Sequence, residues 1–230
     1  MEPSFLITLY SLGITITMYA FSRMLAKEYA WLRATPVFIA TALIILILAV
    51  GGVREQDYSQ AREILAFLLG PATVALAVPI YKNRQHLYDY AVPVVLGLVT
   101  GSVATILVVV AVAKLFQATQ MILLSLGLAS ITAPVALELA HLLKGSTTLT
   151  VGVVIVTGML GAMLAPWLMN RVGVHHPMAR GLVLGTLAQE QGAAQAVAEG
   201  ELQGAIAAIA MGMAAVFIAF LAPVLLPALI

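Results

Sequence analysis

Residues 103–112 read Val-Ala-Thr-Ile-Leu-Val-Val-Val-Ala-Val and lie inside an apolar run that covers residues 91–115. About twenty apolar residues in helical form are long enough to cross a hydrocarbon core about 30 Å thick. A second run, 42–50, is equally free of the apolar–polar alternation expected of a membrane β-barrel strand. A backbone in lipid must satisfy its own hydrogen bonds, so helices are the remaining solution. The sequence therefore predicts an all-α, polytopic helical membrane protein.

The composition of the whole chain agrees with this class. Of its 230 residues, 62% are hydrophobic and 9% are charged, whereas a soluble domain has roughly 25% charged residues. The net charge of +1 leaves no basic surface for nucleic acid. There is no cysteine, and the four histidines lie at or near loop ends. Two of them, His175 and His176, are adjacent but have no third metal ligand at a useful spacing. We expect the lipid bilayer as a partner, and no metal, cofactor or nucleic acid.

Charged loops divide the chain into apolar runs, the first of which we interpret as a retained span. The runs are 4–22, 36–53, 64–81, 91–115, 121–143, 149–169, 181–198 and 203–229. If every run crosses and the N-terminus is outside, the inner and outer loops carry six and five Lys or Arg residues. If the fifth run returns to its own side, the split becomes seven to four. Positively charged loops tend to lie on the cytoplasmic side, so the count favours a re-entrant fifth run. A re-entrant run implies a binding site, because irregular backbone at membrane depth must be surrounded by protein or by a water-filled cavity.

A weak internal repeat relates two proline-interrupted segments. Residues 72–77 and 133–138 share four of six amino acids. Chance similarity among small apolar residues is the alternative. Interrupted segments in corresponding positions point to a transporter binding site and to an inverted repeat. We expect one integral membrane domain over 1–230, divided into scaffold spans 4–57, first repeat 61–115, second repeat 121–170 and C-terminal segments 181–229.

The segment Gly70–Tyr81 carries Pro71 and Pro79. Each proline removes a backbone donor and clashes with the preceding turn, so a continuous straight helix is not expected. Backbone groups freed near Pro71, together with the Thr73 hydroxyl, are candidate substrate ligands. The alternative is a kinked packing helix in which Thr73 bonds its own backbone.

The segment Ser130-Ile131-Thr132-Ala133-Pro134 places two hydroxyls ahead of a proline. Proline is favoured in the first turn of a helix, and a half-helix beginning near Pro134 would direct its positive end at Ser130 and Thr132. A carboxylate fits such a position. The alternative is simple N-capping of a broken helix.

Carboxyl and amide groups also occur inside apolar runs. A carboxylate within a span is a functional candidate, so Glu190 and, at lower weight, Glu138 are expected to handle a proton or coupling ion. Gln189 is expected to line the substrate cavity together with Glu190. The alternative places Glu190 in a wet, non-spanning loop. The glycines Gly181 and Gly185 form a small-xxx-small pair that favours helix packing.

The residues resemble one known family over essentially the whole chain. Gly70–Tyr81, preceded by Tyr58, Ile64-Leu65 and Leu69, is similar to a long motif of the LrgB/CidB family. Further matching stretches are 130–136, 156–162 and 179–186. The chain departs from the family pattern in two informative places: Ala129 stands where a lysine is usual, and Gln189 where a histidine is usual. These departures leave two alternatives: Glu190 takes over proton handling, or transport is altered or lost.

The resemblance implies two functions. One is transport of short 2-hydroxy- or 2-oxo-carboxylates such as glycolate, glycerate or pyruvate. The alternative is a holin/antiholin-like regulator of murein hydrolase export and lysis. The resemblance also implies a bacterial cytoplasmic membrane location and a small LrgA-type membrane partner, and a dimer is our default for the oligomeric state. No nucleophile elbow, Walker loop or HExxH motif is present, so we expect no enzyme. We favour an alternating-access, elevator-like carrier that holds its substrate with Pro71, Thr73, Ser130, Thr132, Pro134 and Gln189.

Overall fold

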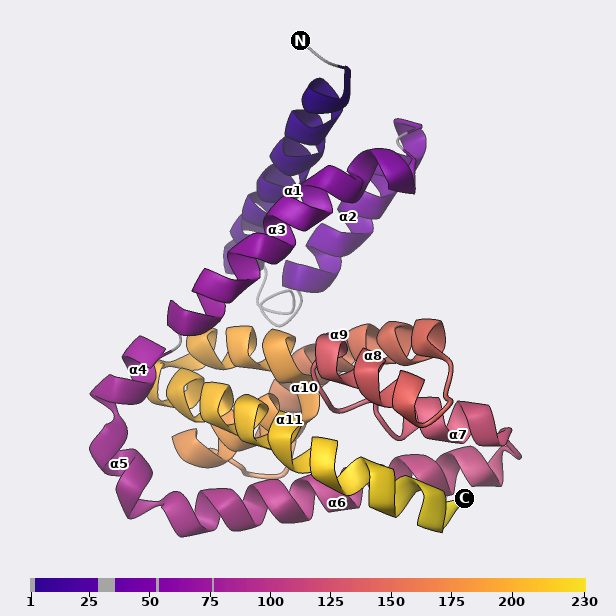
Figure 1. Ribbon diagram of the computed structural model, residues 1–230. Coiled ribbons are helices and arrows are strands. Elements are labelled where there is room, and N and C mark those ends of the chain that lie inside the picture. The colour runs from indigo at the N-terminus through magenta and orange to yellow at the C-terminus, as the bar shows by residue number, and fades with distance from the viewer. Residues whose placement is uncertain (1–2, 29–35, 53, 76) are drawn as a thin grey trace. The chain divides into compact units, whose positions relative to one another are not determined.

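The computed structural model describes residues 3–28, 36–52, 54–75 and 77–230. These residues form helices and no strand (Figure 1), which confirms the all-α class. The chain divides into two compact units, Met1–Leu76 and Ala77–Ile230. The boundary falls inside the range 61–115, so the pairing of that range with 121–170 as two repeats stays a prediction.

The first unit is a three-helix assembly in which α1 packs against both other helices. Its helices are α1 (Pro3–Glu28), α2 (Pro36–Val50) and α3 (Glu55–Ala75). The Thr8 hydroxyl donates to Gln60 Oε1 at 2.8 Å, and the Thr15 and Tyr58 hydroxyls lie 3.0 Å apart. Polar side chains thus join α1 to α3, as is common between helices in lipid.

The prediction that the prolines of 64–81 interrupt a helix is not met at Pro71, which lies inside a helix, and residue 76 lies outside the described residues. Helix α3 continues past Pro71 to Ala75, and α4 begins at Ala77 and contains Pro79. Pro71 and Thr73 therefore belong to the first unit, whereas Ser130, Gln189 and Glu190 belong to the second.

The second unit is built around three long apolar helices. Its helices are α4 (Ala77–Lys82), α5 (Arg84–Asp89), α6 (Ala91–Leu115), α7 (Gln120–Leu126), α8 (Ala133–Leu142), α9 (Thr147–Arg171), α10 (Pro177–Glu199) and α11 (Glu201–Leu229). Of the described residues, only α6, α9 and α11 form helices long and apolar enough to cross a membrane. Large apolar side chains such as Val108, Leu168 and Phe220 are exposed on them. Side chains of this kind are suited to contact with lipid.

The packing fixes the direction of the three long helices. Val94 packs with Ile206, Leu98 with Ala210, and Ile106 further along with Ile218. Helices α6 and α11 are therefore parallel and lie side by side (Figure 1). Helix α9 runs the opposite way. We call the end of the unit near Leu115 and Thr147 the first-hairpin end, and the end near Arg171 and Glu201 the second-hairpin end.

Helices α7 and α8 form a hairpin, which we call hairpin 1, with a break at residues 127–132. The Ser146 amide, just after α8, donates to the Ser125 hydroxyl of α7 at 2.9 Å. In a straight helix these residues, 21 apart, would be separated by about 30 Å. The chain therefore reverses within the run 121–143, in agreement with the re-entrant fifth segment.

Helix α10 is a second hairpin, hairpin 2, because it reverses at Gln189, where the backbone leaves the helical region at φ 49° and ψ −126°. Arg180 of the first arm pairs with Glu199 of the second at 2.7 Å, although 19 residues separate them. A Cβ added to Gly192 would collide with the carbonyl of Leu184. The run 181–198, which the topology count supposed to cross, therefore turns back on itself. At the tip, the Gln189 Nε2 group finds an acceptor in hairpin 1, which lipid would not offer to a crossing helix.

The two hairpins enter the second unit from opposite ends. Hairpin 1 follows α6 and precedes α9, whereas hairpin 2 follows α9 and precedes α11. Hairpin 1 with α9 and hairpin 2 with α11 are thus two copies of one motif that run in opposite directions, which is an inverted arrangement. This arrangement brings the two helix breaks together in the interior.

Candidate functional site

The two hairpin tips are joined by one hydrogen bond. Gln189 Nε2 donates to the carbonyl oxygen of Ser130 at 2.7 Å and to the carbonyl oxygen of Thr186 at 3.0 Å. A Cβ added to Gly161 of α9 would lie 2.9 Å from the Cβ of Ala188. Gly161 is near the middle of α9, a 25-residue helix. The tips therefore meet about half-way along a helix that is long enough to span a membrane.

Gln189 holds a backbone conformation that favours glycine. Its φ of 49° lies in the left-handed region, and its side chain is only 1% exposed. Such a conformation costs on the order of 1–3 kcal/mol for a non-glycine residue. Glycine would avoid this cost, so the amide side chain must compensate for it. The two hydrogen bonds of Nε2 supply that compensation and fix the orientation of the amide, because both atoms facing Nε2 are acceptors.

Some buried polar atoms in the second unit lack a partner. They are Gln189 Oε1, Ser102 Oγ on α6 and Thr150 Oγ1 on α9. The sequence offers no signal for Ser102 and Thr150, since a hydroxyl in an apolar helix usually bonds its own backbone, as Thr105 does with Gly101. An unsatisfied buried polar atom costs about 1–3 kcal/mol. Of these atoms, Gln189 Oε1 lies at a helix break, a position typical of a binding region.

Helix α8 begins at the break of hairpin 1, as the sequence predicts. Pro134 lies in its first turn, and Thr132 is the N-cap residue in an extended conformation. The Thr132 hydroxyl makes no capping hydrogen bond, so the simple N-capping alternative does not describe it. Ser130 is buried at the same tip. The first amides of a helix have no intrahelical acceptor, and α8 therefore offers an electropositive end beside Ser130 and Thr132.

The remaining predicted residues are not all at this site. Glu190 follows Gln189 directly and is half-buried, whereas Glu138 is exposed on α8. Pro71 is exposed on α3, and the side chain of Thr73 lies outside the described residues. The structure thus brings together the tips that carry Ser130, Thr132, Pro134, Gln189 and Glu190. The roles of all predicted site residues stay predictions.

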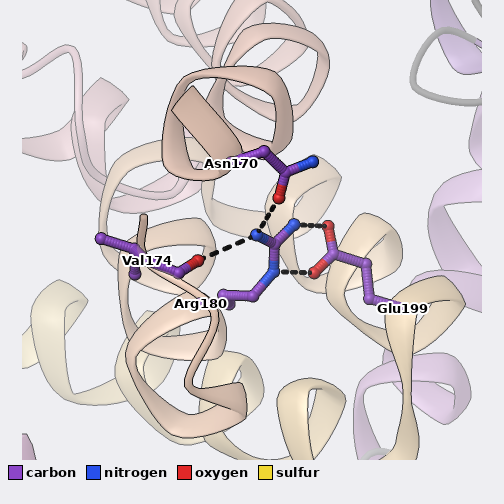
Figure 2. Close-up of polar contacts among 4 residues, drawn as sticks. All are labelled: Asn170, Val174, Arg180 and Glu199. Atoms are coloured by element: carbon purple, nitrogen blue, oxygen red, sulfur yellow. Dashed lines mark hydrogen bonds and ion pairs between the residues drawn. The ribbon is translucent and has the colours of Figure 1, made fainter. Parts of the chain in front are cut away.

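The base of hairpin 2 carries a polar cluster that our sequence analysis missed. Figure 2 shows the Arg180 guanidinium, which donates to both carboxylate oxygens of Glu199 at 2.7 and 2.9 Å. It also donates to Asn170 Oδ1 at 2.7 Å and to the Val174 carbonyl at 3.1 Å. Hydrogen bonding to Glu199 raises the pKa of Arg180 above its ordinary value, so the guanidinium stays charged. The cluster links both arms of the hairpin to the end of α9.

Glycines allow hairpin 2 to pack closely on its neighbours. A Cβ at Gly185 would collide with the backbone of Ala207 on α11, and one at Gly181 with the backbone of Gln203. The prediction that this pair serves helix packing is confirmed. Within the described part of the chain, no three His, Asp or Glu side chains gather as ligands for a metal ion.

Comparison with known proteins places the chain in one family. The model of the LrgB-like family matches residues 15–228. The chain is 29% identical over 220 residues to "Uncharacterized protein YwbG" of Bacillus subtilis (strain 168), covering 96% of this chain and 98% of that protein. It is 30% identical over 215 residues to "Antiholin-like protein LrgB" of the same organism, covering 92% and 93%. It is 29% identical over 219 residues to "Antiholin-like protein LrgB" of Bacillus cereus (strain B4264), covering 95% of each.

No solved structure matches the chain. The family model covers the three long apolar helices and both hairpins. The protein is therefore a helical, multi-pass membrane protein, and it belongs to the LrgB-like family.

Proposed function

We propose that the protein is a carrier of small 2-hydroxy- or 2-oxo-carboxylates that works by alternating access in the bacterial cytoplasmic membrane. The observation that carries this proposal is the meeting of two helix breaks, at Ser130 and Gln189, half-way along α9. Interrupted helices from two inverted units form the midplane sites of many transporters. A purely structural bundle gains nothing from buried, unsatisfied polar atoms at such a depth.

The carboxylate would bind at the N-terminal end of α8. The Thr132 hydroxyl makes no capping bond and is thus free to donate to an anion. The first amides of α8 and the helix dipole would add to the attraction. The substrate class itself is inferred from the resemblance to the LrgB/CidB family. Glu190, half-buried beside Gln189, is the proposed proton-handling group, and Glu138 is a less favoured second candidate because it is exposed.

An elevator-like movement belongs to the same proposal. The spans within 4–57 would form the scaffold, and the two hairpins would carry the substrate. The substrate contacts expected of Pro71 and Thr73 stay predictions. A dimer and a small LrgA-type partner belong to the same proposal. Native mass measurement of the purified protein, and co-purification with an LrgA-type protein, would test them.

Uptake into proteoliposomes tests the carrier. Purified full-length protein would be reconstituted alone, and uptake of radiolabelled glycolate, glycerate and pyruvate would be measured with and without a pH gradient. We expect saturable uptake that Thr132→Val abolishes. Thr105→Val is the matched control, because the Thr105 hydroxyl bonds its own helix at Gly101. Folded protein without uptake above empty liposomes would contradict the proposal.

The second candidate is a holin/antiholin-like regulator of murein hydrolase export and lysis. Two relatives named "Antiholin-like protein LrgB" favour it more directly than they favour a carrier. A regulator would change the lysis rate of its host upon deletion or overproduction, and that effect would persist in Thr132→Val. If Thr132→Val lost both uptake and the lysis effect, the lysis effect would depend on transport.

A further inference from the structure

The side-chain oxygen of Gln189 is a buried acceptor without a donor. Gln189 Nε2 occupies the position between the carbonyls of Ser130 and Thr186, so the amide cannot be reversed without facing oxygen with oxygen. Oε1 therefore points elsewhere and has no partner, in a side chain that is 1% exposed. An amide oxygen accepts from hydrogen-bond donors and binds cations; it does not attract anions. Its ligand must be electropositive.

A second unsatisfied oxygen belongs to α6, which packs against α10. Val94 of α6 packs with Met178 of α10, and four residues later Leu98 packs with Leu182. If this parallel register continues for one further turn, Ser102 of α6 faces Thr186, three residues before Gln189. Ser102 Oγ is buried and also lacks a partner. Two buried, unsatisfied oxygens thus belong to helices α6 and α10, which pack on each other.

The electrostatic surroundings favour a cation over a neutral donor. The first arm of α10 ends at the break, and its last turn is the negative end of a helix dipole. Glu190 adds a half-buried carboxyl group next to Gln189. The only cationic side chain of α10 is Arg180, which is paired with Glu199 at the base of the hairpin.

We propose that the tip of hairpin 2 binds a monovalent cation of the sodium type, with Gln189 Oε1 and Ser102 Oγ as side-chain ligands and carbonyls of the broken helix as backbone ligands. Neutral oxygens with a single nearby carboxyl group suit a monovalent ion, whereas calcium sites use several carboxylates. Carbonyls of unwound helices are typical sodium ligands in transporters. The inference deepens the proposed carrier function, because this ion would couple to the carboxylate at α8.

Thermal unfolding of the purified full-length protein tests the site without any transport measurement. The melting temperature would be compared in sodium, potassium and N-methylglucamine chloride at equal concentration. We expect sodium to raise it by a few degrees in a saturable way, as binding to the folded state requires. Gln189→Leu should abolish the shift. Gln195→Leu, the same change on the second arm of hairpin 2, should retain it.

Ser102→Ala tests the cation site independently if Gln189→Leu does not fold. This variant removes one ligand from α6 and leaves the bonds of Gln189 Nε2 untouched, so we expect about a tenfold higher sodium concentration at half-saturation. Equal melting temperatures of the wild-type protein in sodium and N-methylglucamine would overturn the proposal, as would an unchanged sodium response in Ser102→Ala. Sodium binding without carboxylate uptake would support the cation site and contradict the carrier function. Sodium-independent uptake without a melting shift would support the carrier function and contradict the cation site.

Discussion

Arg180 and Glu199 form a bidentate ion pair across the base of hairpin 2, with nitrogen–oxygen distances of 2.7 and 2.9 Å. The two side chains are 11% and 15% exposed, so the pair is largely removed from solvent. A hydrogen-bonded pair in such surroundings is sensitive to the loss of one partner, since the other charge is left unpaired. The pair holds the two arms together on the side opposite the tip.

Breaking this pair should destabilise the protein. We expect Arg180→Gln to lower the free energy of unfolding by about 3 kcal/mol, because it leaves the Glu199 carboxylate without its partner. The double variant Arg180→Gln/Glu199→Gln should recover part of the loss. Thermal unfolding in detergent measures both. The control is Arg171→Gln, since Arg171 is exposed and contacts the Trp167 ring; a loss there as large as in Arg180→Gln would contradict the assignment.

Cross-linking should distinguish a hairpin from a continuous helix in α10. The chain contains no cysteine, so Arg180→Cys/Glu199→Cys can be made without background substitutions. We expect a short thiol-reactive cross-linker to join the two positions, which would be about 28 Å apart in a straight helix. Mass spectrometry of the digested protein would detect the link. The pair Lys114→Cys/Glu199→Cys spans opposite ends of the second unit and should not react; a link there, or none between 180 and 199, would argue against the hairpin.

Glycine at position 185 should be required for helix packing. A Cβ at Gly185 would overlap the backbone of Ala207, and relief requires α10 and α11 to move apart. We expect Gly185→Ala to cost about 1–3 kcal/mol of stability. Gly152→Ala on α9 meets nothing within 4 Å and should be neutral or stabilising by up to about 1 kcal/mol. Unfolding curves for the two variants that coincide would disprove the close contact.

The membrane orientation follows from the two hairpins. Lys82, Arg84, Arg171 and Arg180 lie at the second-hairpin end, and Lys114 and Lys144 at the first-hairpin end. Positive residues favour the cytoplasm, so the second-hairpin end should be cytoplasmic and the C-terminus, at the other end, should be outside. Alkaline phosphatase fused after Ile230 should be active in cells, and a fusion after Val174 inactive. Equal activity of the two fusions would mean that α10 crosses the membrane once, and the reversed pattern would contradict the orientation.

The interrupted fifth run was predictable from sequence because its cause is local. Pro134 starts a helix in its first turn, and the hydroxyl residues before it favour a break, so α8 begins where the sequence places it. The glycine pair Gly181 and Gly185 likewise predicted close packing. The reversal of α10 had no such signal. Gln189 is an ordinary helix former, and its left-handed conformation exists because the bond to Ser130, 59 residues away, supports it.

The sequence by itself determined that this is a helical membrane protein with a broken segment before Pro134, because chain length in apolar runs and the missing proline N–H act locally. Its motifs also pointed to the family to which the chain belongs. Only the tertiary structure decided that Arg180 meets Glu199 and that Gln189 meets Ser130. These contacts join residues 19 and 59 positions apart. Such contacts depend on how α6, α9 and α11 pack around two opposed hairpins, which no local pattern records.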